Sequence, residues 1–221
     1  MLTISCRRAR AVRSENEFSF IQGLDLKNRI ITEFKAIRFA YKLYEGIEAT
    51  NENLLFEVRN QILAYASIYE AVIENVLNSY YSDTVEFDSL MHHIIPMKIS
   101  IPQSKQDILQ NVLSHDGKVI VPFYYTRKRK EKPQVRFDEK CRTAEGLGLI
   151  HKFINDDGVE IDLPSEIIEI YSYRNGIHII AEQRKGINYE LDLSKKAYRR
   201  MRPFIDQLKD KLIQDGKIQI N

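Results

Sequence analysis

A stretch without glycine or proline, residues 51–81, constrains the fold more than any other part of the chain. Apolar side chains recur in it every three to four residues, which is the period of one face of an α-helix. Asn51 can cap this helix, and Glu52 suits the positive end of its dipole. The pattern therefore predicts one long helix, with an apolar stripe formed by Leu54, Val58, Ile62, Tyr65, Tyr69, Val72, Val76 and Tyr80.

The same period recurs in four further segments. Residues 25–48 precede the long helix by a few residues, which favours an antiparallel helix pair. Further helices are expected at residues 135–150, from Pro164 to about Ala181 with Asp162 as its N-cap, and from an N-cap at Ser194 onward. Pro203 is expected to kink or restart this last helix. The fold class is therefore mainly α, a helical bundle.

Residues 82–134 interrupt the helical pattern. Segment 118–126 is rich in Val, Ile, Phe and Tyr, which favours an extended conformation, and the basic run that follows it, residues 127–133, is interpreted as a loop. No shift in composition marks a linker. The chain is therefore expected to form an N-terminal arm, residues 1–24, either solvated or docked, and a single domain, residues 25–221, with an irregular, partly extended insertion at 82–134.

Composition excludes several classes of protein. The net charge is only +2, so a nucleic-acid partner must be argued from local charge. Cys6 and Cys141 suggest no disulfide framework, so a reducing cytoplasm is expected. No apolar run is long enough for a membrane span or a signal peptide. No cofactor motif is found, and His92-His93 lacks a matching ligand cluster, so neither a cofactor nor a metal site is expected.

The segment Tyr171–His178 carries an unusual combination of residues. On the predicted helix, Arg174 and His178 lie four residues apart on an otherwise apolar face with Ile167 and Ile170. A guanidinium group is costly to bury unless it is paired or faces a cleft. Two interpretations follow: a structural arginine that reaches a carboxylate or a helix C-terminus, or a functional site.

Three stretches together resemble the HEPN superfamily of helical domains. They are ASIYEA within residues 64–71, FDEK leading to AEGLGLI within residues 137–150, and YRNGIH at residues 173–178. The resemblance covers roughly residues 25–81 and 135–213. It implies a helical bundle that commonly forms a homodimer. Many members of the superfamily are metal-independent ribonucleases of toxin–antitoxin, abortive-infection or CRISPR-linked systems.

The resemblance also implies roles for individual residues. Arg174 would bind and polarise the scissile phosphate of RNA, and Asn175 would orient the phosphate or the histidine. His178 would transfer a proton as the 2′-hydroxyl attacks, giving a 2′,3′-cyclic phosphate product. The resemblance thus leads us to expect an endoribonuclease, a toxin or antiviral defence effector, with an antitoxin or another defence-system protein as its partner.

The motif departs from the family pattern in one respect. Three residues separate Arg174 from His178, where the family usually has four to six. The superfamily also contains non-catalytic members. The alternative function is therefore a HEPN-like module that dimerises or binds a partner protein or nucleic acid.

The densest basic run of the chain is a candidate RNA-binding site. It follows Tyr124 and Tyr125, so cationic and aromatic side chains could follow an RNA backbone and stack on its bases. The alternative is an ordinary solvated loop. The candidate residues are Arg127, Lys128, Arg129, Lys130 and Lys132.

Overall fold

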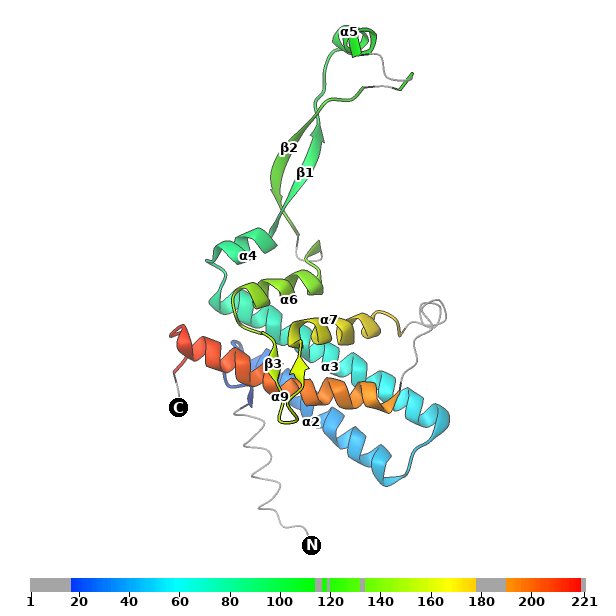
Figure 1. Cartoon of the computed structure of the whole chain (residues 1–221), viewed down its shortest axis with the longest axis vertical. Coiled ribbons are helices and arrows are strands. Elements are labelled where there is room, and N and C mark those ends of the chain that lie inside the picture. Colours follow the sequence, from blue (N-terminus) through cyan, green and yellow to red (C-terminus); the bar gives the residue numbers. More distant parts are fainter. Residues whose placement is uncertain (1–16, 114–116, 119, 132–133, 178–189, 220–221) are drawn as a thin grey trace.

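The computed structural model describes residues 17–113, 117–118, 120–131, 134–177 and 190–219. It confirms the prediction of a mainly α fold (Figure 1). Helix α3 (Asn51–Tyr80) lies in the centre and contacts α2 (Leu24–Gly46), α6 (Phe137–Gly146), α7 (Leu163–Arg174) and α9 (Leu191–Gln214). The predicted long helix is thus the element on which the other helices assemble.

The hydrophobic core forms around the apolar stripe of α3. Tyr69 is fully buried, packs edge-to-face on Phe204 of α9 with 4.9 Å between ring centroids, and donates a hydrogen bond to the carbonyl of Ala197 at 2.8 Å. Phe18 is also buried and packs on Phe34 of α2. The last residues of the predicted N-terminal arm are therefore docked in the core, whereas residues 1–16 lie outside the described residues.

Two predicted details of the final helices differ in the structure. α9 begins at Leu191 rather than at Ser194, and it passes through Pro203 as one helix without restarting. Ser194 is buried and hydrogen-bonds Gln61 of α3, because this part of α9 packs on the core rather than facing solvent. Among the described residues, no helix combines the length and apolar character needed to cross a membrane.

Residues 85–129 form α4 (Val85–Leu90), β1 (His92–Lys98), α5 (Gln103–Leu113) and β2 (Phe123–Arg129). Strands β1 and β2 pair in antiparallel fashion, with His92 opposite Arg129 and Lys98 opposite Phe123. They form a two-stranded ribbon that projects away from the bundle, with α5 at its far end (Figure 1). Interpreting residues 127–133 as a loop was therefore wrong for Arg127–Arg129, which lie in β2 because they pair with the beginning of β1.

A short hairpin leads into α7. Strands β3 (Phe153–Ile154) and β4 (Glu160–Ile161) pair in antiparallel fashion. Asp162 then caps α7 as predicted, since its side chain accepts a hydrogen bond from the backbone N–H of Ser165 at 3.1 Å. α7 ends at Arg174, not at residue 181.

Candidate functional site

Glu70, Phe137 and Arg174, one from each of the three sequence stretches at residues 64–71, 137–150 and 173–178, lie around Tyr171 of α7. Its ring stacks on Phe137 of α6, with 4.1 Å between centroids and an interplanar angle of 28°. Its hydroxyl donates a hydrogen bond of 2.9 Å to Glu70 of α3. Burial, together with the bond to the Glu70 carboxylate, raises the pKa of Tyr171. The phenol therefore stays protonated at neutral pH and remains a donor.

Arg174 joins the same group of residues. Its Nη1 atom donates to Glu70 at 2.7 Å and to the hydroxyl oxygen of Tyr171 at 2.8 Å, and its guanidinium carbon lies 5.0 Å from the centre of the Tyr171 ring. The side chains of Arg174 and Glu70 are 31% and 29% exposed. The interpretation that Arg174 reaches a carboxylate is confirmed by this ion pair. Its role toward a phosphate stays a prediction.

A pocket of about 520 Å³ lies beside this group. Asn175 lines it, together with Glu70, Tyr171 and Phe137. Lys140, also on its wall, is only 9% exposed and pairs with Glu74 at 2.7 Å. The pocket is therefore bordered by charged groups of both signs and by two stacked aromatic rings.

Helix α7 ends at Arg174. His178 lies outside the described residues. After Arg174 the chain turns, because the N–H of Gly176 donates to the carbonyl of Tyr173 at 2.9 Å. The helix that was predicted to carry both side chains therefore ends at Arg174, and the predicted stacking of His178 on Arg174 falls on a residue outside the described ones.

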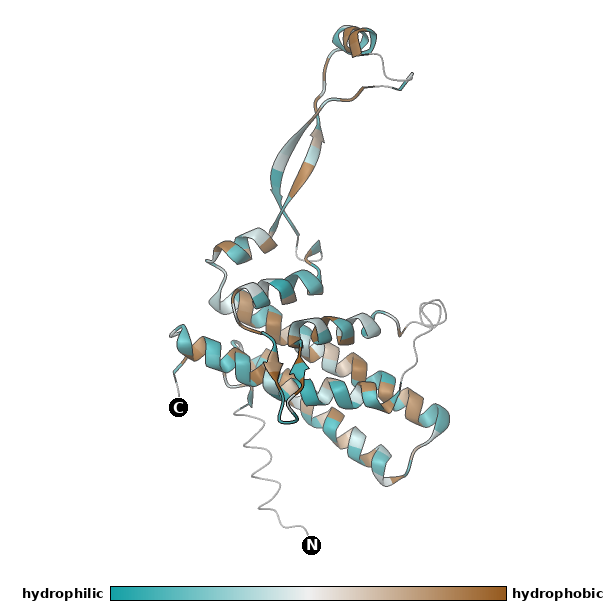
Figure 2. Cartoon of the chain, in the orientation of Figure 1, coloured by the Kyte–Doolittle hydropathy of each residue, from teal (hydrophilic) through white to brown (hydrophobic). Residues whose placement is uncertain are grey.

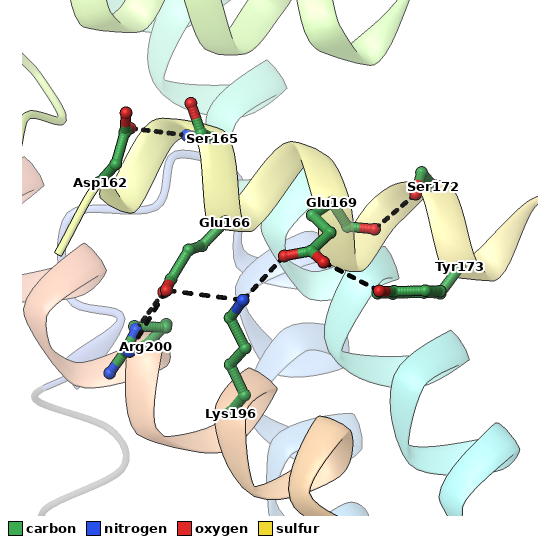
Figure 3. Close-up of polar contacts among 8 residues, drawn as sticks. All are labelled: Asp162, Ser165, Glu166, Glu169, Ser172, Tyr173, Lys196 and Arg200. Carbon is green, nitrogen blue, oxygen red and sulfur yellow. Dashed lines mark hydrogen bonds and ion pairs between the residues drawn. The ribbon is translucent and has the colours of Figure 1, made fainter. Parts of the chain in front are cut away.

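A network of charged residues fixes α7 on α9 (Figure 3). Lys196 of α9 pairs with Glu169 at 2.7 Å and with Glu166 at 3.5 Å, and Arg200 hydrogen-bonds Glu166. Glu169 also accepts a hydrogen bond from Tyr173 at 2.8 Å. The bond from Lys196 lowers the pKa of Glu169, so its carboxylate stays ionised. This network therefore anchors α7 to α9 through Glu166 in its first turn and Glu169 in its middle.

The four predicted RNA-binding residues that the structure describes divide into two groups. Arg127 pairs with Asp88 of α4, and Lys130, whose side chain is 10% exposed, pairs with Glu139 of α6 at 2.8 Å. Lys128 and Arg129 are exposed and form no salt bridge with any described residue. Lys132 lies outside the described residues. The five residues therefore do not form one cluster of exposed cations.

The sequence did not single out Glu70, although it accepts hydrogen bonds from both Tyr171 and Arg174. One signal was present: Glu70 is an acidic residue that lies between Tyr69 and Ile73, which are both buried. A carboxylate at such a position needs a partner, because an unpaired buried charge is unfavourable. Within the part of the chain that the structure describes, no group of acidic, His and Cys residues could hold a metal ion.

Comparison of the chain with protein-family models, with curated proteins and with solved structures finds no match. The fold and the site alone therefore define the class of this protein. It is a mainly helical protein with a projecting two-stranded ribbon and a tyrosine–arginine–glutamate group beside a pocket.

Proposed function

We propose that this chain is a metal-independent endoribonuclease of the HEPN type, a toxin or defence effector that cleaves RNA by attack of the 2′-hydroxyl on the adjacent phosphate. One observation supports this proposal most. The three stretches of the resemblance, far apart in sequence, are in contact through Glu70, Phe137, Tyr171 and Arg174. The proposal includes two facing copies of the chain and an antitoxin or another defence protein as a partner.

In this proposal Arg174 binds the scissile phosphate. A guanidinium group has five N–H donors, and both hydrogen bonds to Glu70 and Tyr171 use Nη1. The other donors are suited to a phosphate, which arginine binds through paired hydrogen bonds. Glu70 and Tyr171 hold the guanidinium in place before substrate arrives, which lowers the entropic cost of binding it productively.

Asn175 and His178 complete the proposed mechanism. Asn175, which follows Arg174 in the chain, lines the pocket, and its amide would orient the phosphate or the histidine. His178 would take the proton from the attacking 2′-hydroxyl, because an imidazole titrates near neutral pH. The product is a 2′,3′-cyclic phosphate, and no metal ion takes part.

The test is RNA cleavage in the presence of EDTA by the wild type and by Arg174→Ala and His178→Ala. Each substitution is expected to lower the cleavage rate by about 100-fold or more, the usual contribution of a positioned proton-transfer or charge-stabilising group. Arg199→Ala and His151→Ala are matched controls on exposed residues and should keep the wild-type rate. If folded Arg174→Ala and His178→Ala both cut RNA as well as the wild type, the site is wrong.

The second candidate function is a non-catalytic HEPN-like module that dimerises or binds a partner protein or nucleic acid. The observation that favours it is the ion pair between Arg174 and Glu70. An arginine that pairs with a carboxylate of its own chain can serve to hold helices together rather than to bind a substrate. In that case the wild type cleaves no RNA. Arg174→Ala then lowers the melting temperature or weakens the dimer, which thermal unfolding and sedimentation measure.

A further inference from the structure

The ribbon, defined as residues 92–130 with β1, α5 and β2, contributes no described residue to the hydrophobic core. It stands clear of the bundle (Figure 1) and carries apolar residues along β1 and α5 (Figure 2). A two-stranded ribbon of this kind is only marginally stable by itself. Large apolar side chains held outside a core mark a surface that binds a partner.

The ribbon carries a net positive charge, which favours a negatively charged partner. Residues 92–130 include seven Lys or Arg and two acidic residues, Asp107 and Asp116, whereas the whole chain has 33 basic and 31 acidic residues. The remainder of the chain is therefore slightly acidic, and the positive charge is concentrated on the ribbon. Such a local excess attracts a polyanion.

Strand β2 combines this charge with exposed aromatic rings. Phe123, Tyr124 and Tyr125 are 54%, 51% and 75% exposed, and they are followed within the same strand by Lys128 and Arg129. Because successive side chains of a strand alternate, Tyr125 and Arg129 lie on one face and Tyr124 and Lys128 on the other. Each face of the ribbon thus presents a tyrosine ring and a cation at a spacing of four residues.

The base of the ribbon is fixed to the bundle by its other cations. Arg127 pairs with Asp88 of α4, and the hydrogen bond from Arg127 lowers the pKa of that carboxyl group. Lys130 pairs with Glu139 of α6, the helix that also carries Phe137 of the candidate site. Lys128 and Arg129 form no salt bridge with a described residue, so their charges are available to a ligand.

We propose that the ribbon binds single-stranded RNA, with unpaired bases stacked on Tyr124 and Tyr125 and phosphates held by Lys128 and Arg129. Aromatic side chains stack on unpaired bases, whereas the bases of a duplex are already stacked on one another and its deep major groove excludes side chains. Cleavage of the bound RNA rests on the proposed function. It adds the class of substrate, which is an unpaired strand.

The experiment measures fluorescence anisotropy of a labelled 2′-O-methyl RNA strand of about 12 nucleotides, a length that an extended aromatic and basic surface can bind. The methyl group blocks attack by the 2′-oxygen, so binding is measured without cleavage. Tyr124→Ala with Tyr125→Ala is expected to weaken single-strand binding by about 30-fold or more, because two stacked bases are lost and each contributes roughly fivefold or more. Tyr124→Phe with Tyr125→Phe keeps both rings and should keep the affinity.

Two further measurements complete the test. The wild type should bind the single strand at least about tenfold more tightly than the duplex of the same sequence. Lys128→Ala with Arg129→Ala should reduce the slope of log affinity against log salt by roughly 1.4, because each phosphate that a protein neutralises on a single strand adds about 0.7 to that slope. Circular dichroism checks that the variants stay folded.

Three results would overturn the proposal: no binding of the single strand by the wild type, equal affinity for single strand and duplex, or unchanged binding by the tyrosine-to-alanine variant. If that variant changes only the sedimentation of the protein, the ribbon is a protein interface instead. Cleavage of unmodified RNA is followed in parallel. Cleavage without ribbon-dependent binding defeats this inference alone, whereas ribbon-dependent binding without cleavage defeats the proposed function alone.

Discussion

At the scale of single residues, Tyr171 joins the parts of the candidate site. It stacks on Phe137, donates to Glu70 and accepts from Arg174, so one side chain connects three helices. The sequence indicated that Arg174 is either paired, with a carboxylate or a helix C-terminus, or part of a functional site, because an unpaired guanidinium on an apolar helix face is unfavourable. It could not identify Glu70 as the partner, since 104 residues separate the two and only the packing of α7 on α3 brings them together.

The ion pair between Glu70 and Arg174 is expected to contribute modestly to stability. Glu70→Gln and Arg174→Met should each lower the free energy of unfolding by about 1 kcal/mol, because both side chains remain partly exposed and the pair is therefore weaker than a fully buried one. In the double variant the effects should be non-additive by roughly 0.5 kcal/mol or more. Urea unfolding of the four proteins measures this coupling, with Arg199→Met as the control. Strict additivity would show that the pair does not stabilise the fold.

At the scale of elements, the beginning of α7 was predictable from its cap, whereas Asn51 does not cap α3, where Thr50 takes that position without a side-chain hydrogen bond, and α9 begins before Ser194. Asp162 and Pro164 identify the beginning of α7 because the capping hydrogen bond is made within one turn. The end of α7 at Arg174 was missed, since the apolar pattern continues through Ile177 while the chain turns at Gly176. The predicted extended segment ended at residue 126, whereas β2 continues to Arg129. Its basic residues lie in a strand because they pair with β1.

The cap of α7 should make stability depend on pH. The hydrogen bond from the backbone N–H of Ser165 lowers the pKa of Asp162 in the folded state. A lowered pKa stabilises the protein above the unfolded pKa of about 3.9, and this stabilisation is lost as the pH falls through the folded value. Asp162→Ala should therefore lower the free energy of unfolding by about 1 kcal/mol at neutral pH, and by less in acid.

Urea unfolding at about pH 7 and about pH 3 measures this difference, a range that spans the titration of aspartate. Asp162→Asn is the matched control, because its side-chain oxygen still accepts the capping bond and does not titrate. It should keep most of the wild-type stability at neutral pH. An Asp162→Ala effect of the same size at both pH values would contradict a cap made by the ionised carboxylate.

At the scale of the whole molecule, the chain separates a slightly acidic helical bundle from a basic ribbon. The bundle was predictable from helical periodicity, because its apolar stripes are buried as the pattern requires. The projection of the ribbon was not predictable, since Ile94, Ile108 and Val112 resemble core residues in sequence but are 71%, 62% and 74% exposed. Burial of a short apolar segment depends on the rest of the fold, and here the bundle forms its core without it.

The most direct test of the ribonuclease proposal is the chemistry of the RNA ends after incubation with the full-length protein in EDTA. Attack by the 2′-hydroxyl leaves a 2′,3′-cyclic phosphate and a 5′-hydroxyl, and a single 2′-O-methyl group at the cut position blocks that cut. We predict this product, its loss in Arg174→Ala, and its persistence in Arg199→Ala. A 3′-hydroxyl with a 5′-phosphate, or cleavage that continues at the methylated position, would contradict the proposed mechanism.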